Sequence, residues 1–282
     1  MQMKFFSIIV VSLNPGERLR KTLNSILEQT FTDYEVIIKD GGSKDGSLDF
    51  LKEEGVLEKY AQLRLVTQPD KSIYDGMNQA VSYVNGKYVQ FLNCGDLFYD
   101  KTVLEKTAEY ILNQEKSDED DGKQTTLLAP AIFYGNQYNL LQNSMVTSAP
   151  YINDFTCYRN VPCHQVCFYD RRLFEKRAYL PQYTVRADYE HFLYCIYEER
   201  ARSFSMPIAV CMYEGGGYSE TKENRKKSTL QHKEITAKYL GKKAVKYRLI
   251  MLFTLSGVRG KIAESPRLSK FYNAVKSILY QR

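Results

Sequence analysis

In this chain of 282 residues, the feature that most strongly constrains the fold is an apolar run that ends abruptly in polar residues. Residues 88–92 are mostly apolar or aromatic, a pattern typical of a strand buried on both faces of a parallel sheet. The next residues include Asn93, Gly95 and Asp96, which are poor strand formers. An amide and a carboxylate are therefore expected at the carboxyl end of a central strand, where open α/β sheets bind ligands.

Two interpretations of this polar strand end are open. Asp96 can hold a hard divalent cation such as Mg²⁺ or Mn²⁺, because such sites combine one or two carboxylates with phosphate oxygens of a substrate. Residues 93–96 can also form a polar turn that binds nothing. The elements around them favour the first interpretation.

Apolar runs alternate with helical periodicity in the first third of the chain. Strands are expected at 4–12, 34–39, 63–67 and 87–92, and helices at 17–29, after Ser43, and at 73–83. Such alternation implies right-handed crossovers and a mainly parallel sheet with helices on both faces. The sequence therefore predicts a single Rossmann-type α/β domain.

An aspartate follows three of the predicted strands. Asp40, Asp70 and Asp96 come after the second, third and fourth strands. The loop after Asp40 contains Gly42, which lets the backbone approach a ligand closely, and Ser43, which can cap a following helix. Carboxylates that converge on one sheet edge predict a binding site. Three separate turns that use Asp for capping or solubility are the alternative.

The middle of the chain carries weaker signals. A helix after Asp100 is expected to end near residue 113, before a charged, solvated loop at 115–123. Residues 126–141 suggest a hairpin that turns near Gly135. A strand at 205–213 opens into the glycine run 215–217, which serves as a loop or as a backbone cradle for phosphate.

Asp188 precedes the apolar run 192–196 and so lies at or near the start of a helix. A carboxylate is electrostatically favourable there. A plain helix cap is therefore one interpretation of Asp188.

Several short motifs occur in a characteristic order. They are Ser7-Ile8-Ile9-Val10 with Asn14, the segments 40–47, 70–78 and 86–96, His164-Gln165, Ala187-Asp188-Tyr189 and the segment 215–219. In this order and spacing, residues 4–220 resemble inverting family 2 glycosyltransferases of the GT-A fold, of the kind that build bacterial surface polysaccharides. The resemblance implies sugar transfer from a nucleotide diphosphate donor, most often a UDP-sugar, to a hydroxyl of a glycan or polyprenyl-linked acceptor, as in polysaccharide or O-antigen synthesis.

The resemblance also implies a set of residues around the donor. The turn after the first strand and Asp40 would contact the nucleotide base, and Asp70 with the helix start at 75–78 would fix the ribose and diphosphate. His164 and the loop 215–219 would lie near the diphosphate or the acceptor. The full set is Ser12, Asn14, Asp40, Gly42, Asp70, Asp75, Asn78, Asn93, His164 and Gly216.

A metal ligand and a general base are implied as well. Asp96 would be the principal ligand of the cation, and Asp188 would take the acceptor's proton if partial burial raises its pKa toward neutrality. Where many relatives have Asp-x-Asp-Asp, this chain has Asn93-Cys94-Gly95-Asp96, with one carboxylate. Two alternatives therefore stay open: a non-catalytic nucleotide-sugar binder, and a nucleotidyltransferase, although the sequence has no GxxxxGK[ST] phosphate loop.

Residues 220–282 form a basic tail after the predicted catalytic domain, 1–219. The tail contains 16 Lys or Arg and 4 Glu, a net charge of +12, and the whole chain carries +6, so residues 1–219 carry −6. Its apolar stretch, 247–258, is shorter than the roughly 20 residues that cross a bilayer. A helical extension is expected that lies on an anionic membrane surface, or packs on the catalytic domain or a partner subunit.

Composition bears on the compartment and the partners. The six cysteines form no CxxC pair and the N-terminus lacks a signal-peptide pattern, so reduced thiols and a cytoplasmic location are predicted. If the tail binds lipid, the location is the inner face of the plasma membrane. The tail has no zinc-finger or RNP signature, so no nucleic-acid partner is expected. The sequence is compatible with a homo-oligomer.

Overall fold

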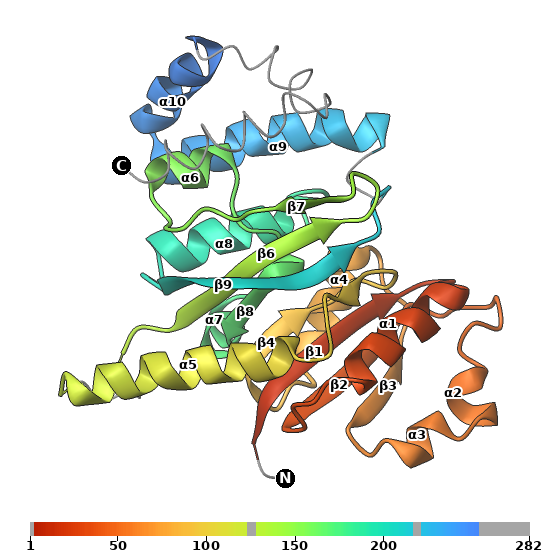
Figure 1. Cartoon of the computed structure of the whole chain (residues 1–282). Helices are drawn as coiled ribbons and strands as arrows, with labels where there is room; N and C mark the ends of the chain where they lie inside the picture. The colour runs from red at the N-terminus through yellow and green to blue at the C-terminus, as the bar shows by residue number, and fades with distance from the viewer. Residues whose placement is uncertain (1–2, 123–127, 217–220, 254–282) are drawn as a thin grey trace.

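A central sheet organises the molecule, for which a computed structural model describes residues 3–122, 128–216 and 221–253 (Figure 1). The strand order is β3-β2-β1-β4-β8-β6-β9-β5, and β7 pairs with β6. The strands are β1 (Lys4–Ser12), β2 (Tyr34–Asp40), β3 (Leu63–Thr67), β4 (Gly86–Phe91), β5 (Leu97–Phe98), β6 (Ala131–Asn139), β7 (Ser144–Val146), β8 (Cys167–Asp170) and β9 (Arg202–Tyr213).

The first four strands are parallel, as the sequence predicts. β1 lies between β2 and β4, and β3 lies on the other side of β2. Ser12 pairs with Asp40 and Asp40 pairs with Thr67, so β1, β2 and β3 end at the same edge of the sheet. The loops that follow these strands are therefore neighbours. The second half of the sheet adds antiparallel β8 and then β6, which runs parallel to β9.

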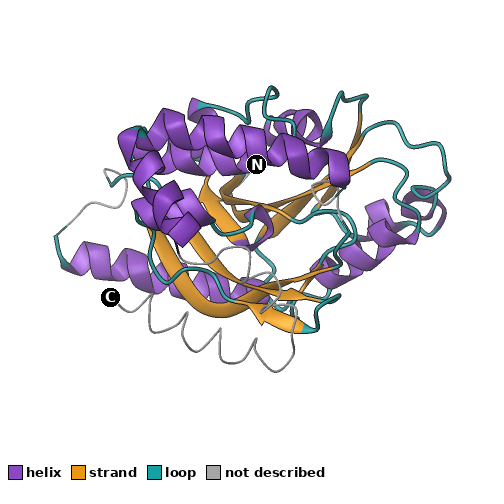
Figure 2. Cartoon of the chain, turned by 90° about the horizontal axis from the view of Figure 1, so that it is seen from above, coloured by secondary structure: helices purple, strands orange, loops and turns teal. Residues whose placement is uncertain are grey.

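Helices lie on both faces of the sheet (Figure 2), which explains why β1 is apolar at consecutive positions. α4 packs on β1 and β2, and α5 packs on β9. The helices are α1 (Glu17–Leu27), α2 (Phe50–Glu53), α3 (Val56–Lys59), α4 (Ile73–Val81), α5 (Val103–Asp120), α6 (Asp154–Arg159), the 3₁₀ turn η2 (His164–Val166), α7 (Arg172–Lys176), α8 (Ala187–Tyr197), α9 (Lys222–Leu240) and α10 (Lys242–Phe253).

The predicted solvated loop at 115–123 is wrong for residues 115–120, which continue α5. Two of its acidic side chains pair with the sheet. Glu115 Oε1 accepts hydrogen bonds from Lys87 Nζ at 2.6 Å and from the Tyr88 hydroxyl at 2.7 Å. Asp118, which is buried, accepts one from Arg202 at 2.6 Å. The segment reads as a solvated loop from its composition, because the partners of Glu115 and Asp118 on β4 and β9 are distant in sequence.

The predicted hairpin turn at Gly135 is also wrong. Gly135 lies inside the single strand β6, where the register against β9 shifts, and the chain turns only after Asn139. A Cβ at position 135 would lie 2.6 Å from the carbonyl oxygen of Ile208, so the glycine permits a close approach at a β-bulge. Ser43, in turn, caps no helix; its hydroxyl donates to Asp40.

The described part of the basic tail is helical, as predicted. α9 packs on α8 and α6, and α10 packs on α6 and α9, at the top of Figure 1. No helix among the described residues is both long enough and apolar enough to span a bilayer. Residues 254–282, including the end of the apolar stretch 247–258, lie outside the described residues. The domain boundary at residue 219 stays a prediction.

A buried carboxylate joins α9 to α8. Glu190 of α8 is 0% exposed and accepts hydrogen bonds from Arg177 Nη2 at 2.8 Å, Lys238 Nζ at 2.9 Å and the Tyr239 hydroxyl at 2.5 Å. Burial alone would raise the pKa of Glu190, but the hydrogen bonds from Arg177, Tyr239 and Lys238 hold it below the usual 4.5. A charge that is paired in this way stabilises the fold only while it is ionised.

We therefore expect Glu190→Gln to lower the free energy of unfolding at pH 7 by about 3 kcal/mol, because Arg177 and Lys238 lose their counter-charge. Glu198→Gln, an exposed change at the end of the same helix, is the control. The difference in free energy of unfolding between the parent and Glu190→Gln should shrink as the pH falls below 4.5, because protonation of Glu190 in the parent removes the same stabilisation. Urea denaturation at pH 7 and pH 4 measures the stability difference and its dependence on pH. Equal stability of Glu190→Gln and Glu198→Gln at pH 7 would contradict the stabilising role of Glu190.

Candidate active site

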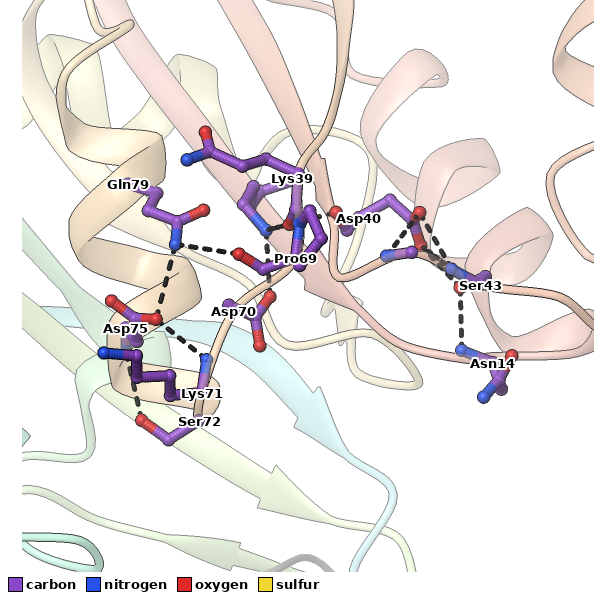
Figure 3. Close-up of polar contacts among 12 residues, drawn as sticks. Asn14, Lys39, Asp40, Ser43, Pro69, Asp70, Lys71, Ser72, Asp75 and Gln79 are labelled. Carbon is purple, nitrogen blue, oxygen red and sulfur yellow. Dashed lines mark hydrogen bonds and ion pairs between the residues drawn. The ribbon is translucent and has the colours of Figure 1, made fainter.

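Two polar loops meet where β1 and β2 end (Figure 3). Asp40 is fully buried and its carboxylate accepts hydrogen bonds from the amides of Gly42 at 2.9 Å and Ser43 at 3.0 Å. The Asn14 amide donates to the Ser43 hydroxyl at 2.8 Å, and Asn14 Oδ1 accepts from the Lys44 amide at 2.9 Å. Asp40 therefore shapes its own loop, and that loop is tied to the turn after β1.

Asp70, after β3, is held by a buried lysine. Lys39 Nζ, on a side chain with 0% exposure, donates to Asp70 Oδ2 at 2.8 Å and to the Gln68 carbonyl at 2.6 Å. A Cβ on Gly41 or on Gly76 would come within 2.9 Å or 3.1 Å of the same carboxylate oxygen. The close approach of the Asp70 side chain explains Gly41, and Asp70 together with Val11 Cγ1, 2.9 Å from a Cβ at position 76, explains Gly76.

The start of α4 closes this group. Ser72 caps the helix by accepting from the Asp75 amide at 3.2 Å, and Asp75 Oδ2 accepts from the Lys71 amide at 2.8 Å (Figure 3). Asn78 lies apart from the group. Its amide donates to the Tyr179 carbonyl at 2.8 Å and accepts from the Tyr179 amide at 2.9 Å, which ties α4 to the segment before α8.

Ser12 and Gly216 are two further predicted residues near these loops. Ser12, at the end of β1, is 4% exposed, and its hydroxyl has no hydrogen-bond partner among the described residues. A buried, unpaired hydroxyl at the shared strand edge is consistent with a ligand that supplies the partner. Gly216 has a φ of 69°, in the left-handed region, while Gly217, Tyr218 and Ser219 lie outside the described residues.

A second group of polar residues surrounds Asp188. Asp188 is the second residue of α8, two residues after the N-cap Arg186, and its carboxylate contacts two side chains from other elements. His164 Nδ1 lies 2.9 Å from Asp188 Oδ2, and the Tyr74 hydroxyl donates to Asp188 Oδ1 at 2.8 Å. His164 Nε2 lies 3.2 Å from Asn93 Oδ1. The predicted residues Asn93, His164 and Asp188 thus form one continuous chain of polar contacts.

The predicted rise in the pKa of Asp188 is wrong. Burial acts in that direction, but the hydrogen bond and charge of His164, together with the hydrogen bond from Tyr74, hold the pKa below its usual 3.8. Asp188 is consequently ionised at neutral pH and can accept a proton. Each of its oxygens has a second lone pair beyond the hydrogen bond that it already accepts.

Asp96 lies in the loop after β4, just before β5, and β1 separates β4 from β2 in the sheet. It is 3% exposed; its Oδ2 accepts from Gln165 Nε2 at 2.6 Å and its Oδ1 from the Glu214 amide at 2.9 Å. Burial raises the pKa of Asp96, and the nearby charge of Glu214 acts in the same direction. Arg18 Nε lies 3.0 Å from Glu214 Oε2 and offsets part of that negative charge.

The donor set around Asp96 fits a Mg²⁺-type ion only with help from a substrate. Asp96 and Glu214 supply hard carboxylate oxygens, and such ions commonly take one or two carboxylates plus substrate phosphates. Among the described residues, no group of three His, Cys, Asp or Glu is arranged to hold a metal ion by itself. A cation here would therefore share its coordination with a diphosphate.

A cavity of about 770 Å³ opens beside Asp188. Asn93, His164, Gln165 and Asp188 line it on the side of the sheet, and Ser228 of α9 and Met251 of α10 line it on the side of the tail. Arg159 and Arg186 also face it. The tail therefore forms one wall of the cavity.

Four residues of these groups were missed by the sequence analysis: Arg18, Tyr74, Gln165 and Glu214. Gln165 stands in the quoted His164-Gln165 pair and Tyr74 within the quoted segment 70–78, so a motif signal existed for both. Arg18 and Glu214 reach the site only through the fold, because α1 and the end of β9 come together beside β4.

Comparisons with known proteins agree with this architecture. The family model described as glycosyl transferase family 2 matches residues 7–124. The PGL/p-HBAD biosynthesis glycosyltransferase of Mycobacterium tuberculosis is 31% identical over 220 residues, 77% of this chain and 79% of the relative. The poly(ribitol-phosphate) beta-N-acetylglucosaminyltransferase TarP of Staphylococcus aureus is 32% identical over 123 residues, 42% of this chain and 35% of the relative.

Two solved structures share the fold. S. aureus TarS 1-349 in complex with UDP-GlcNAc has a TM-score of 0.59 at 16% identity, over 84% of this chain and 71% of that one. The mannosyltransferase PcManGT from Pyrobaculum calidifontis, in complex with GDP-Man and Mn²⁺, has a TM-score of 0.63 at 12% identity, over 99% and 86%. Taken with the match to the mycobacterial enzyme, these findings establish that the chain belongs to glycosyl transferase family 2 and is a glycosyltransferase.

Proposed function

We propose that this enzyme transfers a sugar from a UDP-sugar to a hydroxyl of a glycan or polyprenyl-linked acceptor, with inversion at the anomeric carbon. The observation that carries the proposal is the ionised, partly buried Asp188 carboxylate on the wall of a cavity. A family 2 glycosyltransferase needs such a group to accept the proton of the acceptor hydroxyl. The structures of TarS with UDP and with UDP-GlcNAc support the choice of nucleotide.

The donor would lie along the edge where β1, β2 and β3 end. The loops with Asn14 and Asp40 would hold the uracil, and the unpaired Ser12 hydroxyl beneath them would gain a partner. Asp70 and Asp75 would face the ribose and the diphosphate (Figure 3). Asn93 and Gly216 would lie beside the diphosphate. Asn78 is the least supported member of the set because both its polar groups are used by Tyr179.

The reaction would be a single in-line displacement. The acceptor oxygen forms a bond to the anomeric carbon while the bond to the diphosphate oxygen breaks, and the acceptor's proton moves to Asp188. His164 and Tyr74 keep the carboxylate ionised and aimed at the cavity before the reaction. Because attack comes from the face opposite the leaving diphosphate, the anomeric configuration inverts.

Asp96 would hold the divalent cation, Mn²⁺ or Mg²⁺, together with the diphosphate. When bound, the cation would neutralise charge that develops on the leaving UDP. Glu214 is the second carboxylate within reach, and the exposed Arg18 beside it adds a positive charge at the same place. Gln165 would keep the Asp96 side chain oriented.

The charges of the cavity bear on the acceptor. Of the described residues that line it, Asp188 is the one carboxylate, whereas Arg159 and Arg186 are both cationic. A cavity with this balance favours an acceptor that carries a phosphate, as a polyprenyl-linked sugar does. This supports a lipid-linked acceptor over a neutral glycan.

One exposed face of α10 suits an anionic membrane surface. Lys242, Val245, Lys246 and Leu249 are exposed and follow each other at helical spacing, so basic and apolar side chains share one face. Lys and Arg near an anionic leaflet contribute on the order of 1 kcal/mol each. Such contact would place the enzyme at the inner face of the plasma membrane, beside a polyprenyl-linked acceptor. A homo-oligomer through the same face is the competing proposal.

Asp188→Asn should fold and bind UDP-sugar as the parent does, but lose on the order of 10²-fold or more in kcat, because an amide cannot accept the proton. In the parent, kcat/KM should stay level from neutral pH down to about pH 5, since the pKa of Asp188 is held below 3.8. Steady-state kinetics across the pH range measure kcat and kcat/KM, and titration with UDP-sugar measures donor affinity. An acid limb centred near pH 6.5, or a variant within a few-fold of the parent, would assign the base elsewhere.

Asp96→Ala should weaken UDP binding about tenfold and abolish any gain in affinity on addition of Mn²⁺, because the cation loses its carboxylate ligand. Asp100→Ala, four residues later at an exposed position, should leave both unchanged. Isothermal titration calorimetry with UDP, with and without Mn²⁺, provides the comparison. Equal affinities for Asp96→Ala and the parent under both conditions would remove the metal role.

Val245→Asp combined with Leu249→Asp should reduce co-sedimentation with anionic vesicles at least severalfold, because two carboxylates would replace apolar contacts beside Lys242 and Lys246. Leu112→Asp, an exposed leucine of α5, is the matched control. If the parent sediments no better with anionic than with neutral vesicles, the membrane proposal fails. A change in mass by light scattering in the double variant would favour the homo-oligomer.

A further inference from the structure

A side chain of the basic tail holds the backbone that leads into the Asp188 helix. Gln231 of α9 accepts hydrogen bonds through Oε1 from the amides of Val185 and Arg186, both at 3.1 Å. Its Nε2 donates to the Thr184 hydroxyl at 3.2 Å. One side chain from a different helix thus contacts three consecutive residues just before α8.

Gln231 binds the two amides that lead into α8. Arg186, the N-cap residue, makes no side-chain cap hydrogen bond, and its backbone N–H and that of Val185 both donate to Gln231. Ser228 reinforces the contact one helical turn earlier in α9. Arg186 Nε donates to the Ser228 hydroxyl at 2.8 Å and to its carbonyl at 3.1 Å. Two residues on the same face of α9 therefore fix the residues before Asp188.

The same backbone is connected to the Asp188 carboxylate on its other side. The Tyr74 hydroxyl lies 3.0 Å from the Val185 carbonyl and 2.8 Å from Asp188 Oδ1. Val185 therefore bonds to Gln231 through its N–H and to Tyr74 through its C=O. A movement of this peptide would shift the hydroxyl that helps to hold Asp188.

We propose that Gln231 is a positioning residue for the general base, and that α9 is in this way part of the catalytic apparatus. The proposal rests on the proposed role of Asp188. Gln231 acts through the backbone at 185–186 and through Tyr74, and it need not touch donor or acceptor. Transfer rates are sensitive to such placement, because small displacements of a catalytic group from its reactive geometry lower the rate strongly.

The test compares three variants of the full chain. Gln231→Leu keeps the approximate volume and removes the acceptor, whereas Gln231→Glu keeps an oxygen acceptor at the same place. Tyr183→Phe is the matched control, because it removes a 2.9 Å hydrogen bond from the same loop to Glu234 of the same helix without touching residues 185 and 186. Donor hydrolysis, measured as UDP release from a UDP-sugar alone, reports kcat, and calorimetry with UDP reports donor affinity.

We expect Gln231→Leu to lower kcat about tenfold with unchanged UDP affinity, Gln231→Glu to recover most of the loss, and Tyr183→Phe to stay within twofold of the parent. Equal losses in Gln231→Leu and Tyr183→Phe would show general weakening of α9 docking and overturn the proposal. Parental kcat in Gln231→Leu would overturn it as well.

Amide hydrogen exchange separates this inference from the proposed function. Loss of the Gln231 acceptor should speed exchange at Val185 and Arg186 at least tenfold in Gln231→Leu, and leave it unchanged in Tyr183→Phe. The measurement needs no turnover and no known acceptor. Unchanged exchange in Gln231→Leu refutes the anchor even if the enzyme transfers sugar. Faster exchange in an enzyme that releases no UDP from any donor would instead refute the proposed function, and with it the role of Gln231.

Discussion

The partly buried Asp188 carboxylate, whose side chain is 24% exposed, is the constraint on which the rest of the site depends. A carboxylate that loses most of its contact with water is stable only if charge and hydrogen bonds replace the lost solvation. Here His164 and Tyr74 provide them, from η2 and from α4. Because Tyr74 is in the helix whose first turn carries Asp75, the same element links Asp188, the proposed general base, to the polar loops after β1, β2 and β3. The position of α4 on β1 and β2 therefore sets the geometry of both groups.

The parts of the fold that follow from local pattern could be predicted from the sequence. The four apolar runs became β1 to β4, and their common edge followed from right-handed parallel connections, so Asp40, Asp70 and Asp96 could be placed at strand ends. The prediction was wrong where a residue type was chosen for a contact with a residue distant in the sequence. Gly135 was a bulge against Ile208 instead of a turn, and Glu115 and Asp118 paired with β4 and β9 instead of solvent.

The candidate site shows the same division. Asp188 could be picked out by its motif, but its pKa could not, because the groups that lower it lie 24 and 114 residues away in the chain. Burial alone predicts a raised pKa for Asp188, whereas its contacts with His164 and Tyr74 lower the pKa. Arg18 and Glu214 had no motif signal and are found only because α1 and β9 meet beside Asp96. Membership of glycosyl transferase family 2 favours a transferase over the nucleotidyltransferase and the non-catalytic binder that the thinned motif at 93–96 had left open.

The structure also changes the meaning of the basic tail. Sequence alone left open whether the tail lies on a membrane or packs on protein; in the structure Ser228 and Met251 line the cavity and Glu190 binds two residues of α9. The basic tail and the acidic body thus share one site. The helices of the tail thus form one wall of the cavity beside Asp188.

Proton NMR of a transfer reaction tests the central claim most directly. Purified enzyme would be supplied with a panel of α-linked UDP-sugars, with and without Mn²⁺, and with an acceptor that carries a lipid-linked phosphate, and the anomeric proton of the product would be observed. The account predicts UDP release with a β-linked product, because one displacement assisted by Asp188 inverts the anomeric carbon. An α-linked product, or donor binding without UDP release for every sugar, would contradict it.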